Sequence, residues 1–250
     1  MVVFANEALA GMERIGVWPD APAFKFFKTV EFKTETALVA RDPVEWLNGL
    51  KEEGTLGLKL HFAERSPDDY NKASFANGGG RTIIVVEQRT TCEVWESSIN
   101  VVSHTEADAR PWTAVYLQIA PRGPKQWPKA PVLATARPLL ERRLRETLDF
   151  TTRAKFGFEE YFQNGLNALA GAGPPPNPAF SVGQDSKLLT PEAKSVLAAT
   201  GVAWVFWGMG SWIDGLPEEP FRDEYRSVSR NLYQAICEGF CAAVNASSAI

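Results

Sequence analysis

The sequence predicts an α+β protein with a β-rich first half and a helix-rich second half, and two observations lead to this prediction. Up to residue 120, several segments alternate apolar and polar residues, which is the pattern of a strand with one buried face. After residue 135, apolar residues recur every three or four positions, which is the spacing of one helix face. Because no long crossover helix separates the strands, we expect an antiparallel sheet packed by helices from the C-terminal half.

Alternation marks the strands of the first half. Five segments are predicted strands: residues 24–33, 56–63, 81–88, 91–104 and 112–120. Residues 81–88 are apolar on both faces, so this strand is expected in the interior of the sheet. A short helix is expected over residues 42–53, because Asp42 stands before Pro43 as at a typical helix start.

Proline becomes frequent after the last predicted strand. Residues 121–134 are expected to form a connector, because Pro lacks the N–H group that strands and helices use. Helices are then predicted over three stretches: residues 136–170, 190–201 and 220–245. Residues 202–207 are predicted to be a short buried strand or extended segment that leads into a loop.

Length and composition limit the class of protein. A chain of 250 residues suits a single domain over residues 1–250, β-rich over residues 1–120 and helix-rich over residues 135–250. The 45% hydrophobic and 22% charged residues are typical of a globular protein. The formal net charge of −4 gives no electrostatic reason to bind nucleic acid or anionic lipid, so neither is expected as a partner.

Three features bear on the compartment. No apolar stretch reaches the roughly 20 residues that span a bilayer. The first residues lack the basic start and the apolar core of a secretory signal, and we interpret them as mature protein. Three cysteines, an odd number, suit a reducing compartment better than a disulfide framework. Together these features predict a cytoplasmic location without membrane contact.

The sequence carries no catalytic motif that names a reaction. Its two histidines, His61 and His104, lack a neighbouring Ser, Cys or Asp in a familiar arrangement, so both are interpreted as structural or surface residues. Neither a G-x-S-x-G elbow nor an H-E-x-x-H helix occurs. Whether the protein is an enzyme stays open, and no cofactor is expected.

Cys237 and Cys241 lie one helical turn apart in the stretch CEGFC, where two thiolates can share a metal ion. The sequence shows no further ligand nearby, since both histidines belong to the β-rich half. Cysteine is also a common small hydrophobic core residue. We therefore expect core packing for both thiols, with no metal and no disulfide between them.

Residues 77–81, Asn-Gly-Gly-Gly-Arg, present a run of backbone N–H groups that can hold an anion beside Arg81. The run lacks the Lys-Ser/Thr end of a P-loop and opens no predicted helix. A flexible turn before the next strand is the preferred interpretation, and anion binding is the lesser alternative.

Residues 204–214 form the most unusual segment, with tryptophans and glycines next to an apolar run. Glycine lets a backbone turn tightly, and Trp is enriched at binding hot spots. The segment is therefore either a structural corner where the last helix docks or a surface for a ligand or partner. Its candidate binding residues are Trp204, Trp207, Met209, Ser211, Trp212 and Asp214.

The stretch GMGSW, followed by Asp214 and a long amphipathic helix, resembles the ending of some uncharacterised bacterial proteins. There the pattern is expected to read F-G-G-M-G-S-W-N-D. Here Trp207 stands in place of a glycine and Ile213 in place of an asparagine. The resemblance covers only the C-terminal part of the chain and implies a bacterial origin, but it implies no chemistry for these residues.

Two functions follow as alternatives. The first is a cytoplasmic binding protein without catalysis, such as an inhibitor or a toxin-immunity-like protein, which contacts a protein partner through a few anchor residues. The second is a small-molecule enzyme or carrier, with an aromatic-lined pocket for a small apolar ligand between sheet and helices. A deep pocket with convergent polar groups favours the second, and an exposed patch over a packed interior favours the first.

Overall fold

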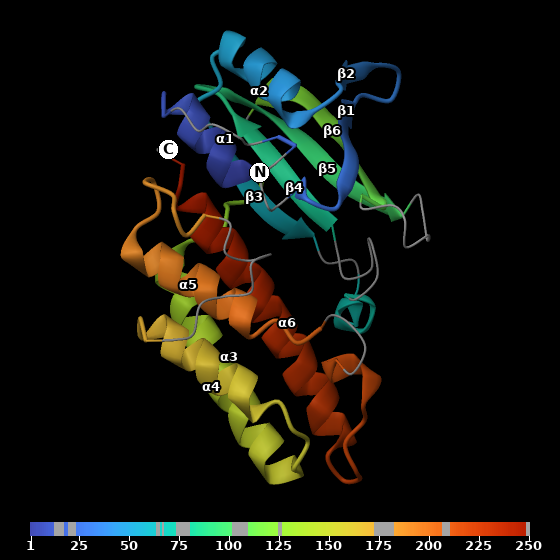
Figure 1. Ribbon diagram of the computed structural model, residues 1–250, viewed down its shortest axis with the longest axis vertical. Helices are drawn as coiled ribbons and strands as arrows, with labels where there is room; N and C mark the ends of the chain where they lie inside the picture. The colour runs from blue at the N-terminus through green and yellow to red at the C-terminus, as the bar shows by residue number, and fades with distance from the viewer. Residues whose placement is uncertain are drawn as a thin grey trace.

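The computed structural model confirms the α+β prediction. It describes residues 1–12, 18–19, 24–63, 66, 68–73, 81–101, 110–124, 127–172, 183–206 and 211–248. Within these residues, a six-stranded sheet comes from the first half of the chain, and four of the six α-helices come from the second half (Figure 1).

The sheet is mixed rather than purely antiparallel. Its strands are β1 (Phe27–Lys33), β2 (Leu38–Ala40), β3 (Gly57–Ala63), β4 (Arg81–Glu87), β5 (Thr91–Val101) and β6 (Trp112–Pro124). They lie in the order β2-β1-β6-β5-β4-β3. Neighbouring strands are antiparallel, as predicted, except for the parallel pair β1 and β6. The sequence also missed β2, because three residues are too few to show alternation.

The parallel pair follows from the path of the chain. After β1 and β2, helix α2 (Pro43–Glu52) leads to β3 at the opposite edge of the sheet, and β4, β5 and β6 return as an antiparallel meander. The meander reaches β1 with β6 running in the same direction. Helix α2 begins where predicted, since the Asp42 carboxylate accepts hydrogen bonds from the N–H groups of Val44 and Glu45 at 2.8 and 2.9 Å.

Strand β6 continues to Pro124, so its predicted end comes too early. The register between β5 and β6 steps at this point and leaves Pro121 and Arg122 opposite Glu93 alone. Such a β-bulge tolerates a residue that has no N–H group. Beyond Leu117, β6 has no register partner in β1, so proline interrupts no ladder with that strand.

The predicted helical stretches are confirmed, and one further helix is present. The helices besides α2 are α1 (Val2–Leu9), α3 (Leu133–Ala154), α4 (Glu159–Leu169), α5 (Pro191–Val202) and α6 (Arg222–Asn245). The hydroxyl of Thr190 caps α5 by accepting from the N–H of Ala193 at 3.2 Å. Sequence reasoning missed α1 because its first six residues are all buried, so it shows no polar face.

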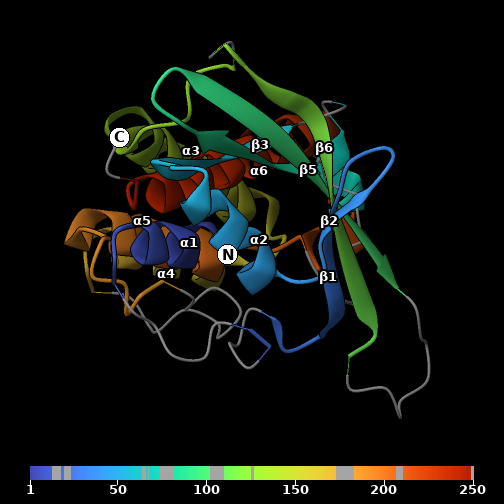
Figure 2. The same ribbon diagram turned by 90° about the horizontal axis from the view of Figure 1, so that it is seen from above.

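The helices gather on one side of the sheet, which we call its inner face (Figures 1 and 2). Helices α1 and α6 contact β3, α2 contacts β1 and β2, and α6 in turn packs against α3 and α5. A single hydrophobic core therefore joins the sheet to the helices. Within the described residues, no helix combines the length and the apolar character that crossing a bilayer requires.

Strand β4 is buried on both faces, as predicted for an interior strand. Ile84 and Val86 belong to the main core on the inner face. A smaller apolar cluster is buried on the opposite face, which we call the outer face: Ile83, Val85, Cys92 and Val94. The sheet therefore has a second packed surface, away from the helices.

Candidate functional site

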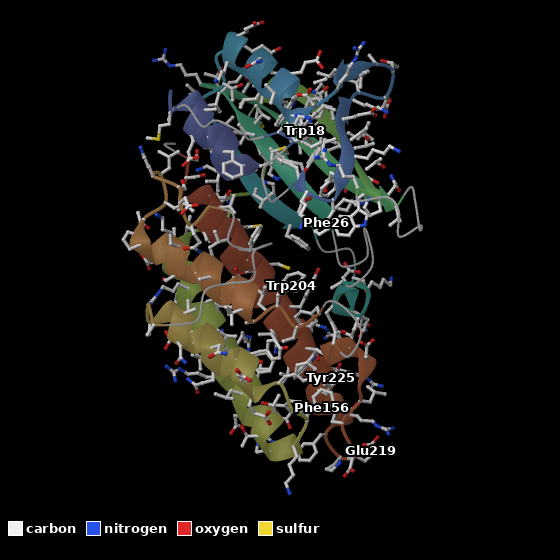
Figure 3. The ribbon with its side chains drawn as sticks, in the orientation of Figure 1. Trp18, Phe26, Phe156, Trp204, Glu219 and Tyr225 are labelled. Atoms are coloured by element: carbon white, nitrogen blue, oxygen red, sulfur yellow. The ribbon has the colours of Figure 1, made fainter. Side chains whose placement is uncertain are left out.

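Trp212, the central residue of the candidate segment, lies in the core. Its side chain has no exposed surface. Five aromatic rings surround it, with centroids 5.2 to 6.2 Å from its own: Phe150, Phe156, Phe158, Phe162 and Tyr225. The rings come from α3, the turn that follows it, α4 and α6, and Figure 3 shows Phe156 and Tyr225 close together there. Trp212 therefore anchors the helices to one another.

Each polar atom of this anchor is matched within the protein. The indole N–H of Trp212 donates to the Ser229 hydroxyl at 2.7 Å, and that hydroxyl donates to the carbonyl of Tyr225 at 2.6 Å. The Tyr225 hydroxyl donates back to the carbonyl of Trp212 at 2.7 Å. Burial raises the pKa of Tyr225 well above its usual range, so the phenol stays protonated and keeps donating.

Ser211 and Asp214 form a cap around Trp212. The Asp214 carboxylate accepts from the backbone N–H of Ser211 at 2.8 Å and from its hydroxyl at 3.2 Å, and the Trp212 N–H bonds to the carbonyl of Val205 at 2.9 Å. This is a capping box around the short 3₁₀ helix Trp212–Asp214. The Ser-Trp-x-Asp pattern therefore has a structural explanation: the cap sets the direction in which the Trp enters the core.

The other aromatic candidate, Trp204, belongs to a second cluster nearer the sheet (Figure 3). Its half-buried ring meets Phe206 and Tyr233 at centroid distances of 6.0 and 5.9 Å. Trp207 and Met209 lie outside the described residues. Of the candidates, the structure thus brings Ser211, Trp212 and Asp214 together. The segment had two interpretations, a structural corner and a binding surface, and the buried position of Trp212 corresponds to the structural corner.

Cys237 and Cys241 are buried and form no disulfide, and they face a cavity whose lining the sequence did not indicate. The cavity has a volume of about 260 Å³ and lies between β3, α6 and the segment before α3. It is lined by His61, Phe62, Lys129, Pro131, Gln234, Cys237, Glu238 and Cys241. The fold thus brings His61 to the two cysteines, although within the described residues no three His, Cys, Asp or Glu side chains are placed to share a metal.

Two titratable side chains that line the cavity, His61 and Cys241, are uncharged at neutral pH. Burial and the nearby Lys59 lower the pKa of His61, so its imidazole is uncharged at neutral pH. Burial also raises the pKa of Cys241 to about 12, and a protonated thiol is a poor nucleophile. Charge enters the lining through Lys129 and through Glu238, whose carboxylate accepts from the side-chain amide of Gln234 at 3.2 Å. The arrangement suits binding better than thiol chemistry.

On the outer face, Trp127 packs over the apolar cluster of β4 and β5. Its ring stands edge-on to the ring of His61, with centroids 6.2 Å apart. Together with Ala63 and Ala120, Trp127 covers this apolar cluster on the outer face.

The part of the outer face formed by β6 carries exposed apolar side chains. Leu117 and Ile119 are 37% and 42% exposed, and the half-buried Val115 lies on the same alternation. We call these three residues the outer-face patch. Leu117 lies opposite Lys33 of β1 in the register, and Lys33 pairs with Glu31 at 2.5 Å. The predicted alternation of residues 112–120 did not show which face of this strand points away from the helices.

The comparisons with known proteins are negative. No protein-family model matches the chain, and neither a curated protein nor a solved structure matches it.

Proposed function

We propose that the protein acts without catalysis by binding a protein partner through the outer-face patch, as an inhibitor or a toxin-immunity-like protein does. The observation that supports this proposal is the exposure of Leu117 and Ile119, two residues apart on β6. Clustered exposed apolar residues mark interaction sites more often than scattered ones. In this proposal the protein belongs to the bacterial cytoplasm, where cysteines that form no disulfide, such as these, stay reduced.

The surroundings of the patch fit a protein interface. Ion pairs stand on either side of β6 on the outer face: Lys33 with Glu31 on β1, and Arg81 with Glu96 across β4 and β5. An apolar centre with a polar rim is the usual anatomy of an interface between proteins. Because the pairs carry both signs, the patch should select its partner by shape and apolar contact rather than by net charge.

The proposal is tested by cross-linking followed by mutation. A photoreactive amino acid at position 117 should capture a specific protein, whereas the same group at the 68% exposed Leu216 should not. Binding of the purified partner should weaken at least tenfold in Leu117→Asp, as expected when about 1.4 kcal/mol is lost. The control Leu216→Asp should bind normally. Capture at both positions, or equal binding by both variants, would disprove the proposed contact.

A second candidate function rests on the cavity beside His61. Its apolar wall and its two oppositely charged groups, Lys129 and Glu238, suit a small ligand with an apolar body, held by a carrier or an enzyme. A screen of small compounds by thermal shift tests this function, with Gln234→Trp as the variant that fills the mouth. A compound that stabilises the wild type but not the variant would favour this candidate over a protein-binding role.

A further inference from the structure

Within the part of the chain that the structure describes, strand β3 is the last strand of the sheet, since it pairs there with β4 alone. An edge strand presents unpaired N–H and C=O groups to any other chain that can pair with them. Here Leu58 and Leu60 are buried, with exposed fractions of 0% and 7%, so their backbone groups need partners inside the protein. Two asparagine side chains supply those partners.

Asn6, on helix α1, is bonded to both backbone groups of Leu58. Its side-chain amide donates to the carbonyl of Leu58 at 3.1 Å, and its carbonyl oxygen accepts from the N–H of Leu58 at 2.8 Å. The same amide also donates to the hydroxyl of Ser247 at 2.9 Å. Asn6 is only 4% exposed. Its hydrogen bonds to Leu58 and Ser247 connect helix α1 to β3 and to the C-terminal end of the described residues.

Asn245, the last residue of α6, repeats the arrangement two residues further along the strand. Its carbonyl oxygen accepts from the N–H of Leu60 at 2.6 Å, and its amide donates to the carbonyl of Leu60 at 2.9 Å. A spacing of two residues is the repeat with which a strand offers its backbone groups to one side. The two amides therefore stand where the peptide groups of a seventh strand would be.

We infer that the β3 edge is a latent strand-pairing site for a second copy of this chain, and that Asn6 and Asn245 hold it closed. The strand is complementary to itself when two copies run antiparallel about Leu60. Leu58 then faces Phe62 of the second copy on the inner face, and Lys59 faces His61 on the outer face. Because no two lysines are opposed, pairing brings no like charges together.

This surface is distinct from the outer-face patch, because it is an edge of the sheet and not a face. Helices α1 and α6 also contact β3, so a second copy must displace their ends to reach the edge. The asparagines control that step, since each one holds its helix to the strand by two hydrogen bonds. Removing them should free the edge while leaving the remaining sheet contacts in place.

The test is the mass in solution of Asn6→Ala/Asn245→Ala, with the exposed Asn48→Ala as a control. Light scattering across a range of concentrations should show that the double variant associates at least tenfold more tightly than the wild type and the control. If the double variant does not fold, the same measurement on each single variant decides. A folded variant with the mass of the wild type at every concentration would overturn the inference.

A cross-link identifies the surface that associates. Lys59→Cys with His61→Cys places each new thiol opposite the other residue's thiol in a second copy paired at Leu60. Disulfide-linked dimers should form in the Asn6→Ala/Asn245→Ala background and not with both asparagines present. Association without this cross-link would mean that another surface is responsible, and that result would equally overturn the inference.

Discussion

Replacing Trp212 with alanine tests whether this residue anchors the helices. The indole is fully buried among five rings, and truncating a buried Trp costs roughly 3–5 kcal/mol. Loss of its hydrogen bond adds little, because Ser229 still donates to the carbonyl of Tyr225. In a chain of this length each kcal/mol lowers Tm by about 2–4 °C, so Tm should fall by roughly 6–20 °C.

The measurement is thermal unfolding followed by circular dichroism. Leu216→Ala serves as the control, since Leu216 follows the same segment but is 68% exposed. Its Tm should stay within about 2 °C of the wild type, as expected for a surface substitution. A fall of less than about 4 °C in Trp212→Ala, or an equal fall in the control, would refute the role of Trp212 as a core anchor.

Three more outcomes are expected from buried polar groups. Asn245→Ala leaves two backbone groups of Leu60 without partners at about 1–3 kcal/mol each. The free energy of unfolding in urea should therefore fall by about 2–6 kcal/mol, whereas Asn48→Ala should change it little. Burial lowers the pKa of His61, so as pH falls the imidazole is protonated in the unfolded chain before it is protonated in the folded protein, and the contribution of His61 to stability is lost below about pH 6.5. The Tm of His61→Gln should therefore depend less on pH than the Tm of the wild type. An unchanged pH dependence would contradict this expectation. Burial raises the pKa of Cys241 to about 12, so this thiol should react with iodoacetamide at about pH 8 only after the protein unfolds. Rapid alkylation of Cys241 in the folded protein would contradict this expectation, because it would show that the thiol is accessible.

Most strands and helices could be predicted because alternation and capping are local properties of the sequence. The parallel pairing of β1 with β6 could not be predicted, because it depends on contacts between distant residues. Phe32 of β1 stacks on Trp46 of α2 at 4.2 Å and on Tyr116 of β6 at 5.0 Å between ring centroids. These stacked rings join β1 to β6 and to α2 in the core, and no local pattern in the sequence indicates which rings will meet.

The candidate site was predictable in its residue types but not in its surroundings. The sequence singled out Trp212 for its size and its neighbours, yet the rings that bury it come from three helices and the turn after α3. The cavity shows the same limit, because His61 lies far in the sequence from Cys237 and Cys241, which line the same wall. The interpretation of Trp207 and Met209 as binding residues stays a prediction, since both lie outside the described residues.

The closure of the β3 edge also depends on the order of synthesis. Asn6 is synthesised before the six strands that the structure describes, whereas Asn245 follows every one of these strands. The hairpin of β3 and β4 can therefore form while the backbone groups of Leu60 still lack their final partner. Nascent chains with unpaired strand edges are prone to aggregate. A truncation that spares every strand but removes Asn245 should therefore accumulate in inclusion bodies when the chain is made quickly.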